Sequence, residues 1–178
     1  MKRVLILLIA TVILLSSCSF GDFNMRKDMF SMNDNKVANE SFEKIIVAIQ
    51  NQDSAALKAL FSEKALSEAQ NMDDTIDELF DFYQGYILSV DNNGGPYASR
   101  ERKADGNVIK EIQPTWDVET SEKKYHFAFR EFVQDTEFPD NIGIYALYIV
   151  ETNRLDEPVA DWWMKDGVWI PGITIKKK

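Results

Sequence analysis

The hydrophobic pattern changes its period once, near Tyr86, and this change limits the possible folds more than any other feature. Before it, apolar residues recur every three to four positions, which predicts helices over residues 36–50, 53–61 and 72–83. After it, apolar and polar residues alternate, which predicts strands over residues 86–90, 97–103, 108–119, 124–134 and 142–151. Helices followed by a run of antiparallel strands favour an α+β fold.

Turn and cap residues support this division. Asp53 or Ser54 is expected to cap the second helix, and Gly85 is expected to end the third. Residues 91–96 and 104–107 are dense in Gly, Asn and Asp, which predicts turns between strands. A two-residue turn at Asp166-Gly167 predicts a late hairpin between residues 162–165 and 168–170.

The N-terminus is typical of a bacterial secretory leader. Lys2 and Arg3 precede a run of apolar residues and one threonine from Val4 to Leu15. A helix of that length reaches only about 18 Å, well short of a hydrocarbon core of about 30 Å. This favours a signal peptide over a permanent membrane span.

The leader ends in Leu15-Ser16-Ser17-Cys18, which resembles the bacterial lipobox. The resemblance implies a diacylglycerol on the Cys18 thiol, cleavage before Cys18, and an extracytoplasmic protein anchored to the bacterial cell membrane. The alternative is an ordinary secretory peptide with a chance cysteine, although Cys18 is the chain's single cysteine and stands at the position the motif requires. We therefore expect a signal peptide over 1–17, a lipidated cysteine with a flexible tether over 18–35, and one domain over 36–178.

Charge and composition exclude several classes of protein. The formal net charge is −9, and the only dense basic run is Lys176–Lys178, which reads as a solvated end. An excess of acidic over basic residues, without a basic patch, argues against a nucleic-acid partner. A single cysteine permits no intrachain disulfide, and the chain has no Gly-rich phosphate loop, nucleophile elbow or zinc spacing. We expect no cofactor and no metal.

Three features together resemble the NTF2-like group of folds. They are the helices joined through Asn51-Gln52-Asp53, the long antiparallel strands, and the late segment Trp163–Ile170. This resemblance implies helices packed on a strongly curved antiparallel sheet that forms a cone, and a possible homodimer through the sheet. With the lipobox, the chain resembles an uncharacterised family of lipoproteins from Gram-positive bacteria. The group contains isomerases and dehydratases as well as binding and accessory domains, so the fold leaves function open.

Glu131 is the candidate for catalysis. It shares the strand parity of the aromatic residues Tyr125, Phe127 and Phe129, so it is expected to face the cone. A carboxylate in an apolar cone has a raised pKa and could act as a general base, with Tyr148 and Trp116 lining the cone. Alternatively, the strand ends or bulges there and places Glu131 at the rim.

Four further residues are considered for functional as well as structural roles. His126, the only histidine, has the opposite parity and is expected to contact solvent or the outside of the sheet, with Asp117 an ordinary exposed strand acid. Trp162 and Trp163 are adjacent, so in a strand they point to opposite faces and one of them marks a contact surface.

Two functions follow. The favoured one is a non-catalytic lipoprotein whose cone or outer sheet binds a small apolar ligand, a peptide or another envelope protein. The alternative is an NTF2-like isomerase- or hydrolase-type enzyme that uses Glu131 as its base.

Overall fold

The computed structural model describes residues 32–152, 164–165 and 168–176. Cys18, Trp162 and Trp163 lie outside the described residues. The helical elements are α3 (Met32–Gln50), α4 (Ser54–Lys58), α5 (Glu63–Glu68), α6 (Met72–Phe82) and the 3₁₀ turn η1 (Pro139–Asn141). The strands are β1 (Ile87–Asp91), β2 (Tyr97–Arg102), β3 (Val108–Gln113), β4 (Thr115–Thr120), β5 (Lys124–Asp135), β6 (Gly143–Glu151), β7 (Met164–Lys165), β8 (Val168–Trp169) and β9 (Gly172–Lys176).

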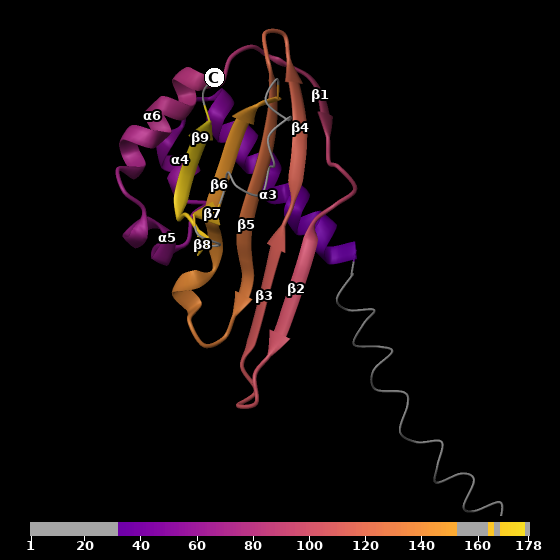
Figure 1. Ribbon diagram of the computed structural model, residues 1–178, viewed down its shortest axis with the longest axis vertical. Coiled ribbons are helices and arrows are strands. Elements are labelled where there is room, and N and C mark those ends of the chain that lie inside the picture. The colour runs from indigo at the N-terminus through magenta and orange to yellow at the C-terminus, as the bar shows by residue number, and fades with distance from the viewer. Residues whose placement is uncertain (1–31, 153–163, 166–167, 177–178) are drawn as a thin grey trace, which may run out of the picture. The chain divides into compact units, whose positions relative to one another are not determined.

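The fold is α+β, with an open sheet of mainly antiparallel strands, as Figure 1 shows. β5 is central: one of its edges pairs with β6, and the other pairs with β4 and then β3. β1 and β2 continue the sheet beyond β4 and β3. The sheet was expected to be antiparallel, and β9 departs from this by joining the far edge of β6 in parallel orientation.

The expected strand over residues 108–119 is interrupted at Pro114, which separates β3 from β4. Proline has no N–H to give to a strand ladder, so the regular pairing breaks there. The register nevertheless continues across it, because Thr115 lies opposite Ala128 and Ile112 lies opposite Glu131, three residues further along both strands. The Pro114 carbonyl still accepts a hydrogen bond from Phe129 N at 3.3 Å. The two short strands therefore act as one long strand.

The helices differ from the expectation at two boundaries, and one helix was not expected. α3 begins at Met32, inside the segment expected to be tether, and the buried Asp34 forms an ion pair with Lys110 of β3. The expected second helix ends at Lys58, and α5 follows it. The cap at Asp53 is confirmed, since Asp53 Oδ1 accepts a hydrogen bond from Ala56 N at 2.9 Å. Ser62 caps α5 in the same way. Among the described residues, no helix combines the length and apolar character needed to cross a membrane.

The main core lies between the helices and one face of the sheet, which we call the inner face. α3 runs along this face, and α5 and α6 contact β9 at the edge (Figure 1). The largest fully buried side chains are Tyr125, Phe127, Phe129, Ile45, Leu57, Ile76, Leu79, Ile112, Ile144, Leu147, Ile149 and Val118. A second, smaller cluster lies on the opposite, outer face and contains Ala128, Ala146 and Tyr148, with Tyr145 and Trp169 packed against it.

The late hairpin was predicted at the right place. β7 and β8 pair antiparallel, with Met164 opposite Trp169 and Lys165 opposite Val168. The following strand β9 was not predicted, and it takes in Lys176, which was expected to belong to a frayed end. β9 completes the sheet by covering the edge of β6, which explains why β6 is buried along most of its length.

Candidate functional site

Aromatic side chains fill the inner face at the position where a cone would hold a substrate. The ring of Trp116 stacks on Phe42 of α3 at 4.3 Å between centroids and 7° between planes. Its other contact is with Phe129, at 5.5 Å and 14°. Trp116 is only 3% exposed. Trp116, which was expected to line a pocket, therefore lies in the core with helix α3 directly on it.

Glu131 lies on the inner face, as its strand parity predicted, and a register shift relative to β6 also falls between Arg130 and Glu131. Its Oε1 accepts a hydrogen bond from Ser41 Oγ of α3 at 3.1 Å. Its Oε2 is buried and has no hydrogen-bond partner. Burial raises the pKa of Glu131, against the opposing effects of the Ser41 hydrogen bond and the charge of Lys44. A carboxylate with a raised pKa is thus enclosed between α3 and the sheet.

Tyr148 does not lie near Glu131, because the alternation of β6 turns it to the outer face. Its hydroxyl oxygen accepts a hydrogen bond from Ile170 N at 3.2 Å and the hydroxyl donates to Ile170 O at 3.3 Å. Burial raises its pKa to about 12. Its ring meets Trp169 at 5.7 Å. Tyr148 therefore holds the segment after β8 against the sheet, and the expectation that it lines a cone beside Glu131 was wrong.

On the outer face the structure brings together His126 and Asp117. Nδ1 of His126 lies 2.7 Å from Asp117 Oδ1, and Asn93 Nδ2 donates to Asp117 Oδ2 at 3.2 Å. Asp117 is therefore paired and not an isolated surface acid. It also lines a groove of about 250 Å³, the sheet groove, whose walls are Ser89, Asp91, Asp117, Val118, Glu119, Lys124, Tyr125 and Thr152. Nε2 of His126 is buried and has no hydrogen-bond partner.

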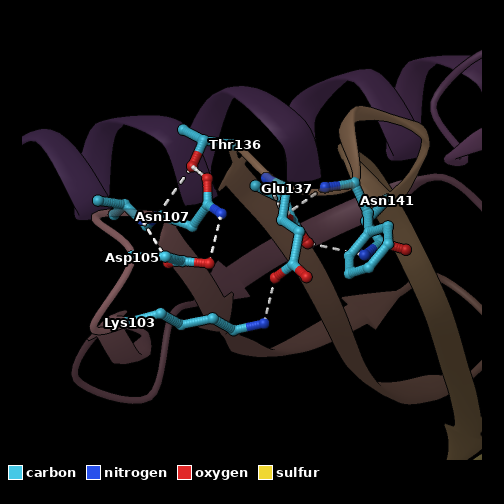
Figure 2. A network of polar contacts seen from close by, with 9 residues as sticks. Lys103, Asp105, Asn107, Thr136, Glu137 and Asn141 are labelled. Atoms are coloured by element: carbon cyan, nitrogen blue, oxygen red, sulfur yellow. Dashed lines mark hydrogen bonds and ion pairs between the residues drawn. The ribbon is translucent and has the colours of Figure 1, made fainter.

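A polar network ties the β2–β3 turn to the segment after β5 (Figure 2). Lys103 forms an ion pair with Glu137, and Thr136 Oγ1 donates to Asn107 Oδ1 at 3.0 Å. The carboxylate of the buried Asp135 accepts hydrogen bonds from the backbone N–H groups of residues 137 and 138 and from Asn141 Nδ2. Burial acts to raise the pKa of Asp135, but these hydrogen bonds outweigh it and lower that pKa. These groups satisfy one another, so the network is structural.

The structure also shows a groove between α3 and α4, the helix groove, which the sequence analysis missed. It measures about 430 Å³ and is lined by Glu40, Glu43, Lys44, Val47, Ala48, Asn51, Asp53, Ala56 and Leu60. That volume falls within the range of about 300–1,000 Å³ typical of small-molecule sites. The available signal was Val47, an apolar residue on the charged side of the α3 stripe, which is 48% exposed.

Neither groove is lined by Glu131, Trp116 or Tyr148. Among the described residues, no group of three or more His, Cys, Asp or Glu side chains is placed to hold a metal ion. The arrangement thus includes a groove on the helices, a groove on the sheet, and a carboxylate enclosed in the core.

Comparison with known proteins places the chain in a family without assigning it an activity. No curated protein matches it. Residues 44–152, which run from the middle of α3 to the end of β6, match the family described as a domain of unknown function, DUF5104. These residues contain the central strands and most of both grooves. The chain belongs to the DUF5104 family.

Proposed function

We propose that this protein is a lipoprotein, anchored through Cys18 to the outer face of the bacterial cell membrane, whose NTF2-like domain binds a ligand at its surface without catalysis. The lipobox resemblance of Leu15–Cys18 supports the anchor. A single acyl chain binds a membrane only marginally, whereas the two or three chains of a bacterial lipoprotein anchor it stably. The domain itself begins near the start of α3.

The stack of Phe42, Trp116 and Phe129 is the observation that carries the binding function. In an NTF2-like enzyme the space between helices and curved sheet holds the substrate. Here aromatic rings occupy the part of that space around Trp116, which supports binding at the surface. The helix groove offers accessible apolar surface of suitable size.

The second candidate is an enzyme with Glu131 as general base. Its support is the buried carboxylate with a raised pKa and a free Oε2, a combination common at catalytic sites. Against it, Glu131 touches Ser41 and lines neither groove. A general base must come within hydrogen-bond reach of its substrate. We therefore rank binding above catalysis.

Two experiments test the proposal. For the anchor, Cys18→Ser should move the protein from the membrane fraction to the soluble fraction, and the wild type should carry the mass of a diacylglyceryl cysteine at its new N-terminus. Unchanged fractionation, or an unmodified Cys18, would refute the anchor.

For surface binding, saturation-transfer NMR should detect contact between the full-length protein and a neutral aliphatic probe, octane-1,8-diol. Ala56→Trp fills the helix groove from an exposed helical position and should abolish the contact. Glu131→Gln should leave it unchanged. If Glu131→Gln removed the contact and Ala56→Trp did not, the ligand would enter the interior and the enzyme candidate would take precedence.

A further inference from the structure

The helix groove has a definite direction, because its α3 lining is one stripe along the helix. The α3 residues are spaced three or four apart and are Glu40, Glu43, Lys44, Val47, Ala48 and Asn51. At a rise of about 1.5 Å per residue this stripe is about 16 Å long. The opposite wall comes from Asp53, Ala56 and Leu60, at and after the start of α4. The α3 side of the groove is therefore elongated, which suits a linear molecule.

The middle of the groove is apolar. Val47 and Ala48 from α3 face Ala56 and Leu60 across it. No aromatic ring lines the groove. Contact with such a surface removes water from a hydrocarbon chain, and the gain is proportional to the area covered. Such a surface suits a ligand whose central part is aliphatic.

The two ends of the groove carry carboxylates. Glu40 and Glu43 lie at the end nearer the start of α3, and Asp53 lies at the end where α4 begins. Lys44 is the single basic residue of the lining, so acids outnumber bases three to one. Lys36 forms an exposed ion pair with Glu40 at 3.7 Å, which leaves Glu43 as the main free acid at its end. This distribution favours positive charge at both ends of the ligand.

We propose that the helix groove binds an aliphatic cation with an ammonium group at each end, the chemistry of a linear diamine or polyamine. Its methylene chain lies over Val47, Ala48 and Ala56, one ammonium is placed near Glu43, and the other is placed near Asp53. This inference rests on the proposed surface-binding function and adds the charge class of the ligand.

Three probes with the same eight-carbon chain isolate the effect of charge: octane-1,8-diamine, octane-1,8-diol and octanedioate. Each is titrated against the full-length protein in neutral detergent, with binding followed by saturation-transfer NMR. An exposed charge pair changes affinity by a factor of about two to five, so two pairs should make the diamine bind about tenfold more tightly than the diol. Octanedioate should bind most weakly. The diamine's advantage should shrink when salt is raised to about 0.5 M.

A charge variant and a matched control locate the binding. Glu43→Gln with Asp53→Asn should reduce diamine affinity about tenfold and leave diol affinity unchanged. Asparagine caps helices as well as aspartate does, so α4 should remain intact. The control removes two exposed acids outside the groove, Glu63→Gln with Asp77→Asn, and should change neither affinity.

The outcomes separate this inference from the function on which it rests. Equal binding of diamine and diol, both lost in Ala56→Trp, would keep surface binding and overturn the cationic ligand in favour of an uncharged one. Preference for octanedioate would overturn it as well. If none of the three probes bound, both proposals would fail for small ligands, and the groove would belong to a macromolecular partner or a second copy of the chain.

Discussion

Replacement of Trp116 by alanine tests whether the interior is a packed core or an open cone. Trp116 is 3% exposed and stacks on Phe42 and Phe129. Truncation of a buried Trp or Phe to alanine costs about 3–5 kcal/mol, since both the transfer of apolar surface and the residual cavity contribute. Native domains of this size have a total stability of about 5–15 kcal/mol, so Trp116→Ala should remove a large share of it.

A double-mutant cycle then isolates the stacking contact. Phe42→Ala, Trp116→Ala and the double variant should give a coupling energy of about 0.5–1.5 kcal/mol, the usual range for aromatic pairs. Urea unfolding followed by circular dichroism supplies all four free energies. Tyr97→Ala is the control, because Tyr97 is 68% exposed and its loss should change stability by about 0.5 kcal/mol or less.

A loss below about 1 kcal/mol for Trp116→Ala would contradict a packed interior. It would mean that the indole lines open space, and it would favour the enzyme candidate based on Glu131. Coupling near zero between Phe42 and Trp116 would likewise show that α3 does not lie on the sheet as described.

Three further predictions concern buried polar groups and one close backbone contact. The raised pKa of Glu131 means that the folded state holds its proton more tightly than the unfolded state, so its carboxylate lowers stability as pH rises above the ordinary value of 4.5. The stability of Glu131→Gln minus that of wild type should therefore increase between pH 4 and 7 in urea titrations; a flat difference would contradict the burial. The lowered pKa of Asp135 has the opposite effect, because its stabilising contribution is complete at neutral pH and is lost as pH falls below about 4. The unfolding free energy of wild type minus that of Asp135→Asn should therefore decrease on acidification. An increase in that difference would contradict the network. Gly143→Ala should destabilise the protein by about 1–3 kcal/mol, because φ is +121° and an added Cβ would come within 3.0 Å of Ser62 N. If the variant had the same thermal unfolding midpoint as wild type, this prediction would be wrong.

The alternation of apolar residues identified most strands because each strand has one face on the core. Glu131 illustrates the strength of this signal, since its parity alone placed it on the inner face. Asp53 illustrates a second strong signal, because a cap acts within four residues and needs no distant partner. The sequence could have predicted the break between β3 and β4 at Pro114. It could not have predicted that the register continues across the break.

The features that were missed depend on partners distant in the sequence. Asp34 belongs to α3 because Lys110, 76 residues later, pairs with it. β9 has a strand-like sequence, but its parallel pairing with β6 depends on how the late segment returns to the sheet. Trp116 was assigned to a pocket because strand parity shows the face of a residue and not what packs on it. Tyr148 was assigned to the wrong face because β6 is buried on both faces, so its apolar pattern does not distinguish inner from outer.

The position of β9 has a consequence for how this chain has to be made. A chain is synthesised from its N-terminus, so β6 leaves the ribosome well before Gly172–Lys176 can pair with it. Until then β6 presents an unpaired edge with apolar side chains, which is a template for association with other chains. A premature stop after residue 171 would make that exposure permanent.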